Sequence, residues 1–483
     1  MATISSALNV IDSALDADQS ALNIVSNNVA NANTPGYTRE VANWSENAPI
    51  TISGVAYGTG VTETGPSSIR DGVLNQRLDQ QQQLASASSA RLSALNAAQA
   101  IFTPDSGASG AAAGDIGSDI TGFFKSLSSL EANAGDDALR QQVLSSGAIL
   151  AGDISNAAAS LISQKNALDQ EANGVASQVN ALTTAIAQMN LQIRSVSSNH
   201  DAGTLEDQRA RDIAQLSQLI GINQATVDGN GLSITTTSGQ ILVSDASSFA
   251  ITTGMIGGLT HFVLNGNDIT TELASGGGQL GGDLTARDQD IPNVLAGLDQ
   301  LAYSISTAVN AGNNAGTDLN GVEGTGTNSA GVTGTGSTPL YIFAQPTQVA
   351  GSALAMSVIM TDPNQIAAAG FGNGTGDNSN AVSMAGLSTL PIVNGQNPSN
   401  YYSQFVSELG STVSEVQTEN TALSTSVTQL QTQQNALSGV NLNDEAASMQ
   451  QFERSYQAAS EVFAILNTVM ASALNLGVET AVS

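Results

Sequence analysis

Residues 402–437 read YSQFVSELGSTVSEVQTENTALSTSVTQLQTQQNAL, and residues 4–37 read ISSALNVIDSALDADQSALNIVSNNVANANTPGY. In the later stretch, apolar residues recur at alternating spacings of four and three: Leu409, Val413, Val416, Leu423, Val427, Leu430 and Leu437. Asn420 and Gln434 fill the remaining positions of the seam. This heptad pattern predicts a long helix whose apolar seam needs a partner helix.

The N-terminal stretch carries the same pattern, with Asp18 at its one polar position. Its seam consists of Ile4, Leu8, Ile11, Leu15, Leu22, Val25 and Val29. Thr34, Pro35 and Gly36 end this helix, because Pro disfavours a helical residue before it and Gly permits a turn.

Two asparagines of the last turn, Asn28 and Asn31, are placed to bond across to neighbouring backbone. Tyr37 is placed to anchor the redirected chain. A simple helix terminator and a joint between subunits are both open interpretations of these residues.

A last helix follows the break at Gly439. We expect Asn443 to cap it, with Asp444 and Glu445 suited to the positive end of the helix dipole. Its apolar side consists of Met449, Phe452, Tyr456, Phe463, Leu466 and Met470. These are packing residues, whether the partner is the same chain or a neighbouring copy.

Between these ends, the predicted secondary structure changes several times along the chain. Helical spacing of apolar residues is expected at about 68–102, 116–222 and 284–309. Turn signals and short apolar runs predict strands at about 223–282 and a β-rich, irregular segment at 340–390. The Gly-, Thr- and Asn-rich stretch 312–336 is predicted to be a flexible loop.

The predicted fold class is α+β with several domains. Paired terminal helices form a coiled-coil-like shaft, a long helical bundle follows, and β-rich outer parts are inserted in the middle. The expected domains are an inner helical domain (1–40 with 441–483), a helical bundle (41–222 with 284–315 and 400–440) and a β-rich outer domain (223–283 with 335–395). Such a layout suits the wall of a tube.

Charge and composition exclude several functions. The chain has 12 Lys and Arg against 41 Asp and Glu, a net charge of −29, and no stretch that gathers its cations. Since cations supply the affinity for phosphates and for anionic lipid surfaces, we predict no binding to nucleic acid or membranes. The absence of Cys excludes disulfides and thiolate chemistry. No apolar run is long enough to span a membrane, and no cleavable signal peptide is predicted at the start.

No catalytic, cofactor-binding or metal-binding residue is predicted. The two histidines, His200 and His261, have no metal-ligand spacing, and the Gly-rich stretches lack the Lys-Ser/Thr ending of a phosphate loop. Residues 372–377, GNGTGD, match a calcium-binding β-roll repeat only once, whereas that architecture needs stacked copies.

Two motif pairs point to a known family. SNNVANANTPGYTR at 26–39, with VNLNDE at 440–445 and FERSYQAA at 452–459, resembles the axial proteins of the bacterial flagellum. IRDGVLNQ at 69–76 and LGGDL at 280–284 resemble, more narrowly, the hook-associated protein 1 family. Within the looser match at 204–209, Glu206 stands where that family tends to be apolar.

This resemblance implies a structural protein at the junction of hook and filament. It implies export without cleavage through the flagellar type III apparatus, an export chaperone on the C-terminal helix, and an extracellular place in the flagellum. The implied partners are further copies of the chain, the hook protein and the second hook-associated protein. The alternatives are another flagellar axial protein, a secreted adhesin with the same terminal helices, or an enzyme, for which no site is predicted.

Overall fold

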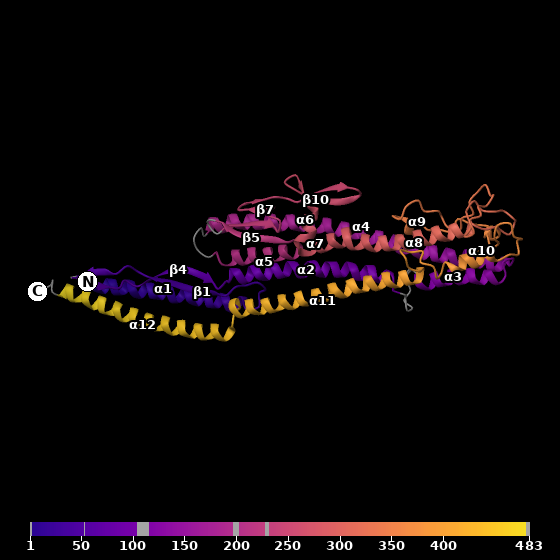
Figure 1. The fold of residues 1–483 in the computed structure, drawn as a ribbon. Coiled ribbons are helices and arrows are strands. Elements are labelled where there is room, and N and C mark those ends of the chain that lie inside the picture. Colours follow the sequence, from indigo (N-terminus) through magenta and orange to yellow (C-terminus); the bar gives the residue numbers. More distant parts are fainter. Residues whose placement is uncertain (1, 53, 104–114, 197–201, 228–230, 480–483) are drawn as a thin grey trace.

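The computed structural model describes residues 2–52, 54–103, 115–196, 202–227 and 231–479. The molecule is elongated, and both termini lie at one slender end (Figure 1). Long helices run lengthwise, and small sheets lie against them. The predicted α+β architecture with paired terminal helices is confirmed.

The described helices differ greatly in length. The longest, α4 (Asp137–Val196), has 60 residues and extends about 90 Å at 1.5 Å per residue. The others are α1 (Ala2–Asn31), α2 (Gly72–Ile101), α3 (Ile116–Ala132), α5 (Thr204–Leu219), α6 (Thr270–Gly276), α7 (Gly278–Thr285), α8 (Ile291–Asn313), α9 (Ser352–Ala355), α10 (Ser379–Gly386), α11 (Pro398–Ser438) and α12 (Leu442–Glu479). A π-helical turn, Ala286–Asp290, joins α7 to α8, and a 3-10 turn spans Pro363–Gln365.

The described strands form four small antiparallel sheets. Their bounds are β1 (Glu40–Glu46), β2 (Ile50–Ile52), β3 (Val55–Tyr57), β4 (Val61–Ser68), β5 (Ile222–Val227), β6 (Gly231–Thr236), β7 (Ile241–Ser244), β8 (Ser247–Ser248), β9 (Thr252–Ile256), β10 (Leu259–Leu264) and β11 (Asn267–Asp268). The sheet orders are β1-β4, β2-β3, β5-β6-β7-β8 and β11-β10-β9. The strands expected at 223–282 are therefore present.

The slender end consists of α1 packed along α12, with β1 and β4 beside α1. Small and branched side chains of α1 are buried there, namely Ala17, Ala21, Ile24 and Val25. Trp44 of β1 meets Phe452 of α12 edge to face, with ring centroids 5.9 Å apart. The terminal helices thus pair with each other, and the hairpin covers part of α1.

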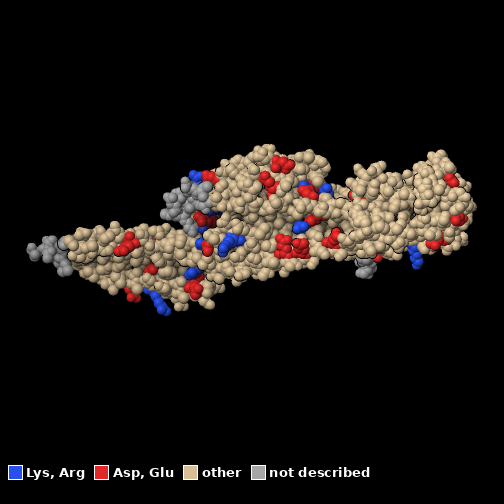
Figure 2. Space-filling view, in the orientation of Figure 1, with Lys and Arg blue, Asp and Glu red and all other residues tan. Residues whose placement is uncertain are grey.

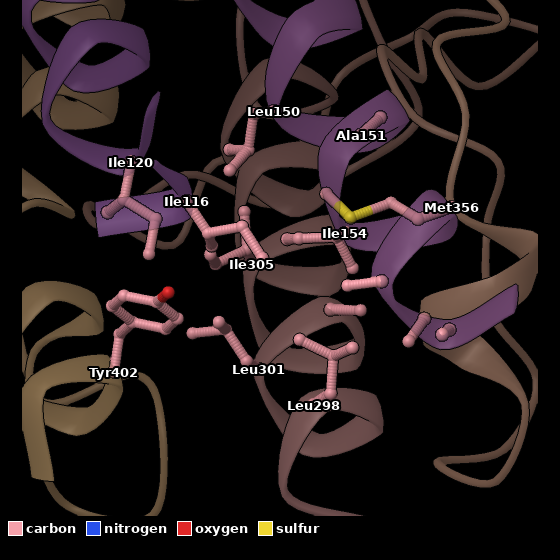
Figure 3. Close-up of a cluster of buried hydrophobic side chains, with 14 of the residues drawn as sticks. Ile116, Ile120, Leu150, Ala151, Ile154, Leu298, Leu301, Ile305, Met356 and Tyr402 are labelled. Carbon is pink, nitrogen blue, oxygen red and sulfur yellow. The ribbon is translucent and has the colours of Figure 1, made fainter. Parts of the chain in front are cut away.

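The far end of the molecule has its own hydrophobic cluster (Figure 3). Side chains from α3, α4, α8, α11 and the segment after α8 point toward one another there. The residues labelled in Figure 3 are Ile116, Ile120, Leu150, Ala151, Ile154, Leu298, Leu301, Ile305, Met356 and Tyr402. A second cluster joins the later half of α4 to α5, α6, α7 and strands β5, β6, β7 and β10.

The structure of residues 340–390 differs from the predicted one. They contain no strand in the structure, only isolated bridges, turns and short helices, so the β-rich prediction is wrong. Asparagine side chains of α8 satisfy the backbone that a sheet would otherwise pair. Asn310 Oδ1 accepts the Ile342 and Phe343 amides at 3.0 and 2.9 Å, and Asn313 Nδ2 donates to Leu340 O at 2.9 Å.

The grouping of 335–395 with 223–283 is wrong for the same reason. Buried side chains of the two segments belong to different clusters, and Figure 1 shows the segments well apart along the molecule. The Gly-rich stretch 312–336 begins with the last two residues of α8 and continues as turns, bends and isolated bridges. Its predicted flexibility stays a prediction, as do the other domain boundaries.

Candidate assembly site at the joint of the terminal helices

A tight turn ends α1 and redirects the chain. Tyr37 N donates to Thr34 O at 3.2 Å, which closes a four-residue turn with Pro35 and Gly36 at its centre. Gly36 has φ of +74°, as the second central residue of a type II turn requires. The predicted helix end is therefore a defined β-turn that leads directly into β1.

Asn28 holds this turn from inside the helix. Its side chain is 1% exposed and makes four hydrogen bonds. Oδ1 accepts Glu40 N at 3.0 Å and the Tyr37 hydroxyl at 2.8 Å. Nδ2 donates to Glu40 O at 2.8 Å and to Glu445 Oε2 at 3.1 Å. One side chain therefore ties α1, the redirected chain and α12 together, as expected of a bond across to neighbouring backbone.

Arg39 and Glu445 continue this contact toward the C-terminal helices. Arg39 Nε lies 2.6 Å from Glu445 Oε1, and the Glu445 side chain is 1% exposed. The Arg39 amide donates to Ser438 O, the last residue of α11, at 2.9 Å. Both C-terminal helices are thus fixed to the same short piece of chain.

The opposite side of the joint is held by α5. Thr38 N donates to Asp207 Oδ2 at 3.0 Å. Arg70 approaches the other oxygen of Asp207 with Nη2 at 2.9 Å and Nε at 3.2 Å. Arg70 also pairs with Glu206 and donates to Gly203 O at 2.8 Å. Arg70 thus donates to three groups of α5 and the residue before it, which fixes the start of α5 against the chain that leads into α2.

We use "the joint" for Asn28, Tyr37, Arg39, Glu40, Arg70, Asp207 and Glu445. Burial raises the pKa of the Tyr37 hydroxyl far above its ordinary value, and the charges of Glu40, Asp207 and Glu445 raise it further. The phenol therefore stays protonated and donates at all ordinary pH values. Figure 2 shows several of the chain's few cations near the place where the slender end meets the wider body.

These contacts have a mechanical consequence. A buried polar network with its partners satisfied fixes one arrangement of the segments that it connects. The joint therefore sets the direction of the terminal helices relative to the rest of the molecule. It offers positioning, and its groups show no arrangement of nucleophile and base.

The predicted seam of α1 is only partly covered. Val25 is buried, Ile4, Leu8, Ile11, Leu15 and Leu22 are half-buried, and Val29 is 39% exposed. On α12, Met449, Phe452, Phe463, Leu466 and Met470 are half-buried, and Tyr456 is 38% exposed. Thr34, Pro35 and Gly36 are exposed at the turn, and Asn31 bonds locally to Asn27. A role of these residues between subunits stays a prediction.

Sequence reasoning missed the charged half of the joint. Arg39, Arg70 and Glu445 lie inside the motifs quoted above, so the motifs were the available signal. Asp207 follows Glu206 in 204–209, the segment that matches the family least well. The residues around Asp207 give no sign that it contacts Thr38 and Arg70. The cap of α12 is also corrected: the helix begins at Leu442, and Asn441 Oδ1 accepts the Asn443 amide at 3.0 Å.

Other kinds of site gain no support. His261 lies 2.7 Å from Asp268 on β10 and β11, and His200 lies outside the described residues. Within the described ranges, no three His, Asp or Glu side chains gather as metal ligands. In the same part of the chain, no helix is long and apolar enough to cross a membrane.

Comparisons with known proteins agree with the terminal motifs. Residues 105–328 match the model of the flagellar hook-associated protein FlgK helical domain, and residues 8–38 match that of the flagella basal body rod protein. The chain is 25% identical to flagellar hook-associated protein 1 of Escherichia coli strain K12, covering 98% of this chain and all of that one. It is also 25% identical to the protein of that name from Bacillus subtilis strain 168, covering 96% of each.

A solved structure shares the fold. The flagellar hook junction protein FlgK from Burkholderia pseudomallei aligns with a TM-score of 0.64 and 18% identity, over 75% of this chain and all of that one. The two family models, the relatives matched nearly end to end and the shared fold agree with one another. Along nearly its whole length, the chain is therefore similar to flagellar hook-associated protein 1.

Proposed function

We propose that this protein is a structural component of the bacterial flagellum, which joins the hook to the filament and assembles through its terminal helices. One observation carries the assembly mechanism: α12 pairs with α1 and still exposes large apolar side chains. Val462, Ile465 and Val469 are 46%, 61% and 46% exposed. Phe463, Leu466 and Met470 of the same helix are half-buried.

The helix is thus apolar on more than one side. A surface helix of a monomer normally has one apolar stripe and a polar opposite face. Apolar residues around the helix indicate burial on several sides, here by further copies of the chain. Because isolated helices are marginal without packing, ordering of these ends accompanies incorporation. The joint then holds the assembled ends at a fixed angle to the body.

The partners and location follow from the same proposal. The neighbours would be further copies, the flagellar hook protein and the second hook-associated protein. Before assembly, a chaperone would cover α12, and the chain would leave the cell through the flagellar type III apparatus without cleavage. Its working place would be the extracellular flagellum, and its role there would be structural.

Deletion of the gene in its host tests this function. We expect cells with hooks but without filaments by electron microscopy, and unpolymerised flagellin in the culture medium. Cells that keep full filaments would refute the junction role.

Removal of residues 443–483 tests the mechanism separately. We expect a truncated protein whose middle part stays folded, judged by cooperative thermal unfolding, but which cannot restore filaments to the deletion strain. Intact junctions built from the truncated protein would refute assembly through α12.

A further inference from the structure

A cavity of about 660 Å³ lies between α2, α4, α7 and α11 in the middle of the molecule. Small and polar side chains line much of it, among them Ser86, Ser89 and Ser93 of α2. None of the described residues that line it is Lys, Arg or His. Negative charge in this cavity therefore has no cationic side chain beside it.

Asp283 brings such a charge into the cavity. Its side chain is 2% exposed, and its Oδ2 has no hydrogen-bond partner among the described residues. Burial, and after it the negative charge of Glu171, raise the pKa of this carboxyl to about 7. Gln279 bonds to Asp283 and also donates to Glu171 at 2.7 Å, so it joins the two carboxylates.

Close packing prevents Asp283 from withdrawing. A Cβ atom at the neighbouring Gly282 would lie 2.2 Å from Ala87 O of α2, and one at Gly281 would lie 2.9 Å from Leu273 O. The backbone of α7 is therefore pressed against α2 and α6. The position of the carboxylate is built into the helix contact.

Two further oxygens on the cavity wall lack partners. Gln164 Oε1 and Asn420 Oδ1 are buried without a hydrogen bond among the described residues. The Gln164 amide is held by its nitrogen, which donates to Ala94 O at 2.5 Å. All three unpartnered atoms are acceptors, so a ligand of this cavity must supply donors or positive charge. Water supplies donors but does not neutralise paired carboxylates.

We infer that this cavity binds a hydrated divalent cation, with Asp283 as the anchoring carboxylate and Glu171 as the second. Hard cations such as Ca²⁺ and Mg²⁺ prefer carboxylate, amide, hydroxyl and water oxygens, which are the groups present here. The described residues hold no group of three His, Asp or Glu ligands, so water must complete the coordination. We therefore expect weak binding, with a dissociation constant on the order of 10⁻⁴ to 10⁻³ M.

The test is thermal unfolding of the full chain after chelator treatment, at pH 8 and constant ionic strength, during titration with CaCl₂ or MgCl₂. We expect the midpoint of the wild-type protein to rise with the divalent cation. Asp283→Asn should remove this response and should raise the midpoint without cation, because it removes a buried unpaired charge. Asp12→Asn, at an exposed position of α1, is the matched control and should keep the response.

Three results would overturn the inference. One is a wild-type midpoint that does not change over the titration. The second is an equal rise in wild type, Asp283→Asn and Glu171→Gln, which would indicate general screening. The third is a midpoint that rises only on acidification from pH 8 to 6, since a proton would then relieve the charge. A Ca²⁺-dependent rise lost in Asp283→Asn alone or in both variants supports the site.

Discussion

Replacement of Asn28 by alanine in the intact chain removes the side chain around which the joint is built. Its partners would be left behind, namely Glu40 N and O, the Tyr37 hydroxyl and Glu445 Oε2. Glu445 keeps Arg39, and Tyr37 is partly buried, so the two Glu40 backbone groups dominate the cost. A buried polar group without a partner costs about 1–3 kcal/mol, so we expect a local loss of about 2–5 kcal/mol.

Amide hydrogen exchange measured by mass spectrometry detects such a loss at the joint. Since about 1.4 kcal/mol corresponds to a factor of 10, a loss of about 3 kcal/mol accelerates exchange about 100-fold. We expect this at the Glu40 amide and in the first turns of α12, with α3 unchanged. Asn31→Ala is the matched control, because Asn31 bonds only within its own turn to Asn27 and Thr34. Equal exchange in the two variants would refute the role assigned to Asn28.

Arg140 is fully buried and donates to the carbonyls of Ala134, Pro363, Asn364 and Ile366. Arg140→Lys should therefore lower the free energy of unfolding by about 2–4 kcal/mol. Arg194 forms an exposed pair with Asp245, so an equal loss in Arg194→Lys would contradict this prediction. Gly282→Ala forces its Cβ against Ala87 O and should lower the thermal midpoint by several degrees, whereas Gly152→Ala, with open space around it in α4, should raise it. Burial raises the pKa of Asp79 to about 6 despite a hydrogen bond from Gln224. The stability that this raised pKa contributes is fully present below the ordinary pKa of an aspartate and is lost as the pH rises to about 6. The free energy of unfolding of the wild type, relative to Asp79→Asn, should therefore fall between about pH 4 and 6. A difference between the two proteins that does not change with pH would argue against this prediction.

The terminal helices could be predicted because their pattern is local. The heptads of α1 and α11 specify helices from their own spacing, and the turn at Thr34 to Gly36 follows from Pro and Gly chemistry. The seam was less well predicted, because Ala17, Ala21 and Ile24 are more deeply buried than Ile4, Leu8 or Leu15. The position of the neighbouring elements decides which face of α1 is buried, and the sequence of α1 does not specify that position.

Residues 340–390 could not be predicted, because their backbone is paired from a distance. Ile342 and Phe343 are apolar and suited to a strand, which misled the interpretation. The amides of both bond to Asn310, more than 30 residues earlier on α8. An asparagine in a helix gives no sign that it replaces the neighbouring strand of another segment.

The chain's few cations connect segments that lie far apart in the sequence. Only 12 of the 483 residues are Lys or Arg, and most of the described Arg contacts connect separate elements. Arg39 pairs with Glu445, Arg91 with Asp290 and Arg287 with Asp169, across 406, 199 and 118 residues of sequence. At Arg91, Nε and Nη2 contact the two oxygens of Asp290, and Lys cannot match this guanidinium fork. Each of these contacts therefore specifies a relative position of helices that apolar packing alone leaves free to slide.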